Sequence, residues 1–282
     1  MKAYVSIDLE GLPGVSSLMQ VAPSLPLYSD ARRVMTWAAN TVSKLLKENG
    51  FDRIVVADSH AYMANISYMD INVPIELIQG YPRPYSMVIG IEEGFDAAFF
   101  IGYHAAAGTL RGFLDHTYSS RVLYRVFVDG KQASEYLLNA YYAGYYGVPV
   151  ALVAGDDHLR IEVEEYTPWA VFVPLKKGLS RISARYPSLG EAEKLLAEGV
   201  KEAARRLKNG ELKPLKPKPL NIKVELREVI YADMAQLIPG SRRLDAYTIE
   251  YDAKNPIDAL GFIELVAWVG LAGHMLVQSM YK

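Results

Sequence analysis

The first residues able to do chemistry are two acids, Asp8 and Glu10, which follow an apolar run at residues 3–7 and precede Gly11. Such a run predicts a buried strand whose carboxyl end carries the acids to the edge where open α/β sheets hold their ligands. Side chains alternate along an extended strand, so both carboxylates project to the same side and can reach one ion or two adjacent ions. The alternative is that one of the acids caps a following helix.

Two of the five histidines, His60 and His104, directly follow apolar runs at residues 53–57 and 97–101, which are also predicted strands. Each histidine by itself is more often structural than a metal ligand. Together with the two acids, however, they mean that three strands deliver metal-ligand residue types to one edge of a sheet. This convergence favours a metal site.

Glu135 is a fifth candidate ligand, because it falls in the first turn of a helix predicted over residues 134–146. Its alternative role is a favourable interaction with the helix dipole. The chain has no cysteine, so it can form neither a disulfide nor a thiolate nucleophile. Any metal must therefore be bound through oxygen and imidazole.

The elements that position these residues predict an α/β fold with a mostly parallel central sheet covered by helices. Nearly continuous apolar runs are typical of strands buried on both faces. The expected strands are residues 3–7, 53–57, 75–78, 97–101, 122–128 and 148–153, with a hairpin turn at Asp129-Gly130. The expected helices run from a cap at Asp30 to a stop at Asn49-Gly50, over residues 134–146, and onward from a capping box at Ser188 and Glu191.

A stretch of alternating lysines and prolines at residues 213–219 can join neither a helix nor a central strand and predicts an extended connector. A strand at residues 221–228 and an apolar helix at residues 255–275 follow it. We therefore expect a catalytic α/β domain over residues 1–210 and a smaller α+β extension over residues 211–282.

Composition narrows the classes of partner. The 282 residues carry a net charge of −2, which gives no reason to expect nucleic acid or an anionic membrane. The chain enters a strand without a secretory signal, so we expect a cytoplasmic protein. Asp258, Glu264 and His274 interrupt the apolar C-terminal helix, which favours a buried or oligomer-facing helix over a membrane span.

An ordered set of motifs over about the first 160 residues is similar to the zinc D-aminopeptidases of the DppA type, peptidase family M55. No single motif is diagnostic, but the set is. The motifs are Ser6-Ile7-Asp8-Leu9-Glu10-Gly11, Asp58-Ser59-His60, Gly102-Tyr103-His104-Ala105, His116, Glu135-Tyr136-Leu137-Leu138-Asn139-Ala140, Ala143-Gly144-Tyr145-Tyr146, and the run from Pro149 to Asp157.

The resemblance implies that two zinc ions per chain are held by five residues, with an aspartate bridging the pair: Asp8, Glu10, His60, His104 and Glu135. It places His116 at the position that the family treats as catalytic, although the stretch from Ala105 to Asp115 is one residue longer than the family pattern. It also implies a large homo-oligomeric ring, which we expect to be a decamer.

Two zinc ions that share a carboxylate suit hydrolysis by activated water, and we expect a dinuclear zinc aminopeptidase acting on short peptides, including peptides with D-residues. His116 would act as an acid, a base or an oxyanion donor. Asp115 or Asp58 is a candidate for binding the free α-amine of the substrate. Asn139 lies one helical turn after Glu135 and is a second candidate for substrate contact.

Two other classes of function remain open at this point. Bridging carboxylates and histidines serve a dinuclear phosphoesterase equally well, although the chain has no Gly-Lys-Ser phosphate loop and no evident basic cluster at the predicted strand ends. A metal-binding protein without catalytic activity is the third class.

Overall fold

The body of the protein is built around a seven-stranded sheet in the order β3-β2-β1-β4-β7-β8-β9. The computed structural model describes residues 1–280. All neighbouring strands of this sheet are parallel except β8 and β9, which form an antiparallel hairpin. The strands are β1 Lys2–Ile7, β2 Arg53–Asp58, β3 Glu76–Ile78, β4 Ala97–Tyr103, β7 Val150–Asp156, β8 Val171–Ser180 and β9 Ser183–Arg185.

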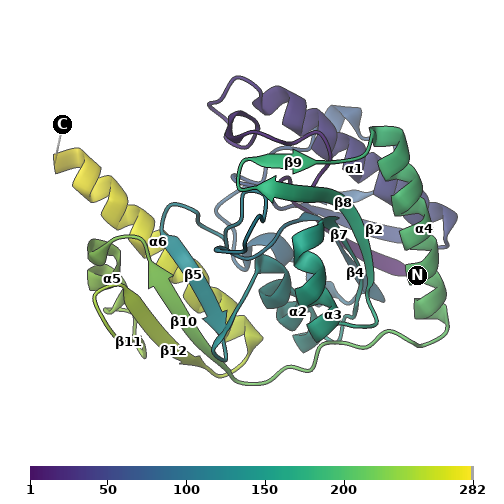
Figure 1. The fold of residues 1–282 in the computed structure, drawn as a ribbon. Helices are drawn as coiled ribbons and strands as arrows, with labels where there is room; N and C mark the ends of the chain where they lie inside the picture. Colours follow the sequence, from purple (N-terminus) through teal and green to yellow (C-terminus); the bar gives the residue numbers. More distant parts are fainter. Residues whose placement is uncertain (281–282) are drawn as a thin grey trace.

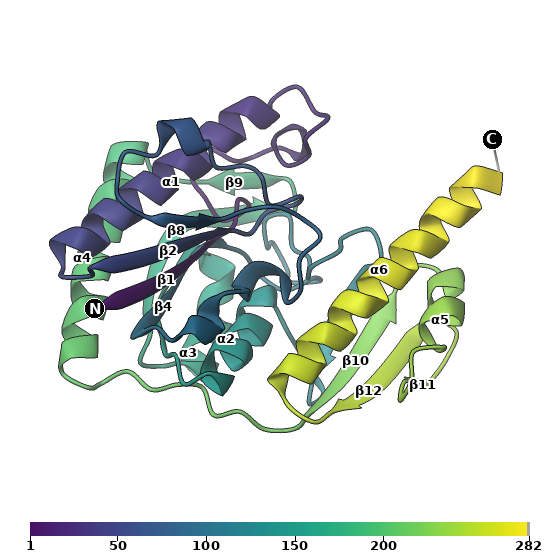
Figure 2. The same cartoon turned by 180° about the vertical axis from the view of Figure 1, so that it is seen from behind.

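Helices cover both faces of this sheet, which confirms the predicted α/β class (Figures 1 and 2). On one face, α1 (Tyr28–Glu48) and α4 (Leu189–Lys208) share a core with Ala3, Val5 and Ile7 of β1. On the other face, α2 (Glu135–Tyr145) packs on β4 and β7, and α3 (Arg160–Tyr166) packs on α2. Alternate residues of each central strand therefore enter different cores, as the continuous apolar runs require.

A second, antiparallel sheet has five strands in the order β11-β12-β10-β5-β6. Its strands are β5 Leu123–Val128, β6 Lys131–Gln132, β10 Leu220–Leu226, β11 Arg242–Arg243 and β12 Thr248–Ala253. Two helices pack on it, α5 (Val229–Ala235) and α6 (Pro256–Met280). The expected division into residues 1–210 and 211–282 stays a prediction, and this sheet takes β5 and β6 from before the connector.

One apolar core joins the two sheets. Residues of α2 such as Leu138 and Tyr142 belong to the same buried cluster as Val126 of β5, Val224 of β10 and Ile263 of α6. The α2 helix thus packs on the parallel sheet with one side and faces α6 with another. The C-terminal elements therefore complete the covering of α2.

Most of the predicted helix boundaries are confirmed, with one correction. The α2 and α4 helices are capped by Ser134 and Ser188, whose hydroxyls accept hydrogen bonds from the backbone amides of Leu137 and Glu191. The α1 helix begins at Tyr28, so Asp30 lies in its first turn and is not the cap. Its carboxylate still interacts favourably with the amino end of the helix. Short 3₁₀ turns lie in the connecting loops at Leu18–Gln20, Tyr68–Asp70, Ser86–Val88, Ile91–Glu93 and Asp157–Leu159.

Candidate metal centre

The candidate site lies where the strand order of the parallel sheet reverses. From β1, the strands β2 and β3 are added on one side of the sheet, and the strands β4, β7 and β8 are added on the other. The order therefore reverses between β1 and β4. A crevice outside the carboxyl ends of the strands at this point is the usual ligand site of open α/β sheets. Asp8 and Glu10 follow β1, His104 follows β4, and His60 follows β2 at the same edge.

The strand ends approach one another closely because two glycines leave room. A Cβ atom on Gly102, which has φ +76°, would lie 2.0 Å from the carbonyl oxygen of Asp8. A Cβ atom on Gly11 would lie 2.2 Å from the carbonyl oxygen of Tyr103. Backbone contact at this point brings Asp8 and His104 within reach of one another.

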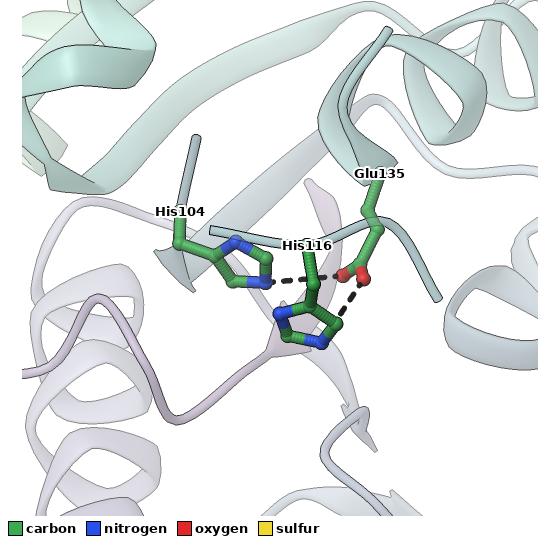
Figure 3. A group of neighbouring side chains, drawn as sticks. All are labelled: His104, His116 and Glu135. Atoms are coloured by element: carbon green, nitrogen blue, oxygen red, sulfur yellow. Dashed lines mark ion pairs between the residues drawn. The ribbon is translucent and has the colours of Figure 1, made fainter. Parts of the chain in front are cut away.

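Glu135 and His116 come from outside the parallel sheet (Figure 3). Glu135 is the first residue of α2, and its buried carboxylate accepts a hydrogen bond of 2.6 Å from the backbone amide of Tyr118. His116 lies on the loop between β4 and β5. In Figure 3 the side chains of His104 and His116 both point toward the carboxylate of Glu135.

The carboxylates and imidazoles form two neighbouring sets of close contacts. In the first, Nδ1 of His60 lies 3.0 Å from Oε2 of Glu10 and 3.5 Å from Oδ1 of Asp8. In the second, Nε2 of His104 lies 3.6 Å from Oε2 of Glu135, and Nε2 of His116 lies 3.6 Å from its Oε1. Nε2 of His104 also lies 3.4 Å from Oδ2 of Asp8, which joins the two sets.

Each histidine is held by a backbone carbonyl on the side away from the carboxylates. Nε2 of His60 bonds the carbonyl of Val21, Nδ1 of His104 that of Ala105, and Nδ1 of His116 that of Leu114, at 2.8, 3.0 and 2.8 Å. A carbonyl only accepts hydrogen bonds, so that nitrogen carries a proton and the other nitrogen faces the carboxylates. Metal-ligating histidines are oriented in this way.

Two buried polar atoms at the centre of the cluster have no hydrogen-bond partner among residues 1–280: Oδ2 of Asp8 and Nε2 of His104. Buried polar groups are normally paired, so such atoms need an explanation. A cation accounts for both, because carboxylate oxygen and imidazole nitrogen are good ligands for zinc and related metals.

The electrostatics of the cluster also call for a cation. Burial, reinforced by the charge of Glu10, raises the pKa of Asp8 to about 8. Burial opposes ionisation of Glu10 as well, but the charge and hydrogen bond of His60, together with the charges of His116 and His104, outweigh it and hold the Glu10 pKa well below its usual range. Burial disfavours the charged form of His104, but the charge and hydrogen bond of Glu135, together with the charges of Asp8 and Glu10, outweigh this and raise the His104 pKa to about 10. Protons thus neutralise part of the carboxylate charge, and a metal ion can replace them.

Two overlapping groups of donor atoms can each hold an ion. One consists of Asp8, Glu10 and His104, and the other of His104, His116 and Glu135, with the donor atoms of each group within 4.8 Å of one another. The residues present therefore fit the metal that the resemblance implies. The structure brings all five predicted ligands to one place, with His60 joined to the first group through Glu10 and Asp8.

His116 lies beside the predicted ligands, as expected, and it is also one of the donors of the second group. Its ring stacks on that of His104, with centroids 4.3 Å apart and planes 12° apart. Burial, followed by the charge of His104, lowers the pKa of His116. A neutral imidazole with a free Nε2 is suited both to accepting a proton and to binding a metal.

The predicted substrate contacts are engaged within the protein. The Asp115 carboxylate pairs with Arg181 and accepts a hydrogen bond from the backbone amide of Gly108. The fully buried Asn139 bonds the hydroxyls of Tyr103 and Tyr118, at 2.9 and 2.8 Å. These partners use the polar atoms that substrate binding would require, while the roles themselves stay predictions.

Asp58 is likewise turned away from the metal ligands. Its carboxylate accepts hydrogen bonds from the backbone amides of Asn65 and Ile66 and from the side chain of Gln79. Asn65 in turn donates to the carbonyl of His60 at 2.7 Å. Asp58 therefore shapes the loop that follows β2, and with it the position of His60.

Lys176, which reaches the site from β8, is a residue that no sequence pattern indicated. Its buried ammonium donates to the carbonyls of Glu10 and Val15 and lies 4.3 Å from the ring centroid of Phe113. Burial lowers the pKa of Lys176 to about 7. The amine fixes the loop that carries Glu10. The sequence could have suggested this role only if the strand that carries Lys176 had been predicted.

Comparisons with known proteins agree with this geometry. The family model of the D-aminopeptidases, peptidase family M55, matches residues 1–265. The D-aminopeptidase of Bacillus subtilis (strain 168) is 34% identical over 262 residues, which cover 92% of this chain and 94% of that protein.

A solved structure is similar over nearly its full length. It is the Zn-dependent D-aminopeptidase DppA from Bacillus subtilis, described as a self-compartmentalizing protease. The two structures superpose with a TM-score of 0.90 and 31% sequence identity, covering 96% of this chain and 98% of that one. The chain therefore belongs to peptidase family M55, the D-aminopeptidases, and as a member of that family it is a metal-dependent hydrolase.

Proposed function

We propose that this protein is a dinuclear zinc aminopeptidase that removes the N-terminal residue from short peptides, including D-residues. The observation that carries the proposal is the convergence of the five candidate ligands in two neighbouring sets, which the contact between Asp8 and His104 joins. Zinc is supported by the oxygen and nitrogen donors and by the zinc dependence of the similar Bacillus subtilis enzyme. Asp8, whose two carboxylate oxygens face His60 and His104 respectively, is the residue suited to bridging two ions.

Zinc held by Asp8, Glu10, His60, His104 and Glu135 would supply an activated water at neutral pH and a Lewis acid for the substrate carbonyl. The protein supplies the proton transfer. His116 is fixed with Nδ1–H on the carbonyl of Leu114, so its Nε2 is the atom that takes up a proton and returns it to the leaving amine. Its lowered pKa keeps the ring neutral and ready to accept that proton near pH 7.

We propose further that the protein is cytoplasmic and acts as a homo-oligomer, a ring of ten copies, without nucleic-acid or membrane partners. The net charge of −2 supports the absence of an anionic partner. Exposed apolar side chains on α6 support association between copies. The description of the Bacillus subtilis relative as self-compartmentalizing is consistent with a closed assembly.

Metal content is the direct test of the site. We expect about two zinc ions per chain in the wild type and nearly none in Asp8→Ala, because Asp8 contacts both sets of donors. Asp70→Ala is the matched control, since Asp70 is an exposed acid away from the cluster. Elemental analysis after dialysis gives the result, and one zinc ion per wild-type chain would exclude the dinuclear proposal.

Substrate choice tests the chemistry. The zinc-loaded protein should hydrolyse D-alanyl p-nitroanilide, and stripping the zinc with a chelator should abolish the activity. Comparison with the rate for L-alanyl p-nitroanilide shows which chirality the enzyme prefers at the first residue. Hydrolysis of p-nitrophenyl phosphate reports the alternative phosphoesterase activity. Turnover of the phosphate ester without turnover of either anilide would replace the aminopeptidase proposal with a phosphoesterase.

A further inference from the structure

The loop that carries His116 is held in an unfavourable backbone conformation. Three of its residues have positive φ although none is glycine: Arg111 at +65°, Leu114 at +46° and Tyr118 at +57°. Each such residue costs about 1 to 3 kcal/mol and persists only where the surrounding structure enforces it. Residues flanking His116 on both sides are therefore held by contacts from elsewhere.

The turn between β8 and β9 supplies those contacts. Arg181, in this turn, donates from Nη1 to both the carboxylate and the carbonyl of Asp115, the latter at 2.6 Å. The backbone amide of Leu114 donates to the carbonyl of Arg181 at 2.8 Å. Arg181 thus binds the two residues that immediately precede His116.

A second connection reinforces the first from the same hairpin. The Asp156 carboxylate, at the end of β7, accepts hydrogen bonds from the backbone amides of Phe113 and Gly178, at 2.9 and 3.2 Å. A Cβ atom on Gly178 would lie 2.1 Å from the carbonyl oxygen of Arg111, so β8 and the loop are in direct backbone contact. The end of β8 is therefore a rigid support for the loop.

Arg181 combines this role with partial access to solvent. Its side chain is 49% exposed, whereas that of Asp115 is only 8% exposed. The Asp115 carboxylate also accepts a hydrogen bond from the backbone amide of Gly108, so it is bound both from inside the loop and from the hairpin. Loss of the guanidinium would leave a nearly buried carboxylate without its counter-charge, which the loop can relieve by turning Asp115 toward water.

Such a movement of Asp115 would displace His116, the next residue in the chain. The imidazole Nδ1 donates to the carbonyl of Leu114, the residue whose amide is bound by Arg181. We propose that Arg181 is a positioning residue for His116, which it holds through Leu114 and Asp115 in the stacked arrangement on His104. The inference rests on the proposed function, because it concerns the residue that moves the proton in that reaction.

The test compares Arg181→Ala with Arg185→Ala in the zinc-loaded protein. Arg185 is an exposed arginine on the adjoining β9 strand, and it has no ion pair among the described residues. For Arg181→Ala we expect kcat to fall by about 10²-fold, the effect of misplacing a catalytic group by about 1 Å. KM and zinc content should stay near the wild-type values, and Arg185→Ala should match the wild type throughout.

Rescue separates positioning from general damage to the fold. Added guanidinium ion should restore a measurable part of kcat in Arg181→Ala, and Arg181→Lys should retain more activity than the alanine variant because it keeps one donor and the charge. A collapse of zinc content together with kcat, or an Arg181→Ala enzyme as active as Arg185→Ala, would overturn the inference.

Crystal structures of zinc-loaded wild type and Arg181→Ala give a readout that does not depend on activity. The inference requires the His116 ring to leave its stacked position on His104 in the variant, and an unmoved ring contradicts it. A wild type that binds zinc but hydrolyses no peptide substrate would defeat the proposed function alone, since the position of His116 can still be compared between the two structures.

Discussion

Buried charged side chains outside the metal centre carry the clearest consequences at the level of single residues. Glu264, on the apolar α6 helix, is 7% exposed and accepts a hydrogen bond of 2.9 Å from the backbone amide of Tyr85. Burial raises the pKa of Glu264 to about 7, although that hydrogen bond and the charge of Arg83 oppose the shift. The folded chain therefore keeps Glu264 protonated over a wider range of acidic pH than the unfolded chain does.

The sign of the resulting pH dependence follows from proton uptake. Between its ordinary pKa near 4.5 and the folded value of about 7, Glu264 binds more protons in the folded chain than in the unfolded chain. The free energy of unfolding therefore decreases as the pH rises through this window. We expect Glu264→Gln, which keeps an acceptor for Tyr85, to exceed the wild type by about 2 kcal/mol at pH 8 and to equal it near pH 5.

Urea unfolding of the zinc-loaded proteins at the two pH values measures this difference. Glu193→Gln on the exposed surface of α4 is the matched control and should give the same stability as the wild type at both. A constant offset between Glu264→Gln and the wild type, independent of pH, would show that burial of this carboxyl does not govern the effect.

The identities of the candidate ligands could be predicted from sequence because each follows a strand or begins a helix at a recognisable boundary. Asp8, His60 and His104 needed only the position of the sheet edge. The surroundings of Asp115 and Asn139 could not be predicted in this way. Their partners, Arg181 and Tyr118 among them, are brought close only by tertiary structure.

At the level of elements, the parallel strands that carry the site were predicted, but β8 was not. Its sequence contains Pro174, Lys176 and Gly178, which break the pattern of a buried strand. The proline is tolerated because β9 pairs with β8 only from Lys177 onward, so one side of β8 is an edge at Pro174. The lysine is tolerated because backbone carbonyls accept its ammonium group.

The contact between β1 and β4 provides the test at this scale. Gly102→Ala would combine a strained positive φ with a Cβ atom 2.0 Å from the carbonyl of Asp8, and backbone cannot move aside as a side chain can. We expect a loss of about 3 kcal/mol or more in stability, together with a loss of zinc, because Asp8 is displaced. Thermal unfolding and elemental analysis measure the two effects.

The substitution Gly94→Ala separates the effect of backbone strain from the effect of a steric clash. Gly94 has φ +83°, and no atom lies within 4 Å of the position that a Cβ would take, so alanine there meets only the backbone penalty. That penalty is about 1 to 3 kcal/mol, and zinc content should not change. Equal effects of the two substitutions would mean that the close approach of β1 and β4 is not what holds Asp8 in place.

At the level of the whole molecule, the end of α6 exposes a group of apolar side chains. The helix packs along α2, α5 and β12, with Gly273 and His274 still in contact with Tyr231 of α5, and its last turns extend beyond these elements toward the C-terminus (Figures 1 and 2). Met275, Leu276 and Met280 are 64%, 50% and 72% exposed. By length and composition the helix could also cross a membrane, although 39% of its most apolar stretch is buried.

Association between copies of the chain explains both the exposed end and the buried start of α6, and burial of such side chains gives about 25 cal/mol per Å². We expect the wild type to have a mass in solution that is a multiple of 31.4 kDa. The double substitution Met275→Lys and Leu276→Lys should shift the mass toward that of one chain, because lysines resist burial in an apolar contact. Light scattering coupled to gel filtration measures the change.

The matched control places two lysines at Asn72 and Asn209, exposed polar positions outside α6, and should leave the assembly intact. The candidate metal ligands all lie on elements other than α6, so zinc content should be preserved in both variants. A wild type that runs as a single chain and sediments with lipid vesicles would instead assign the exposed end of α6 to a membrane surface.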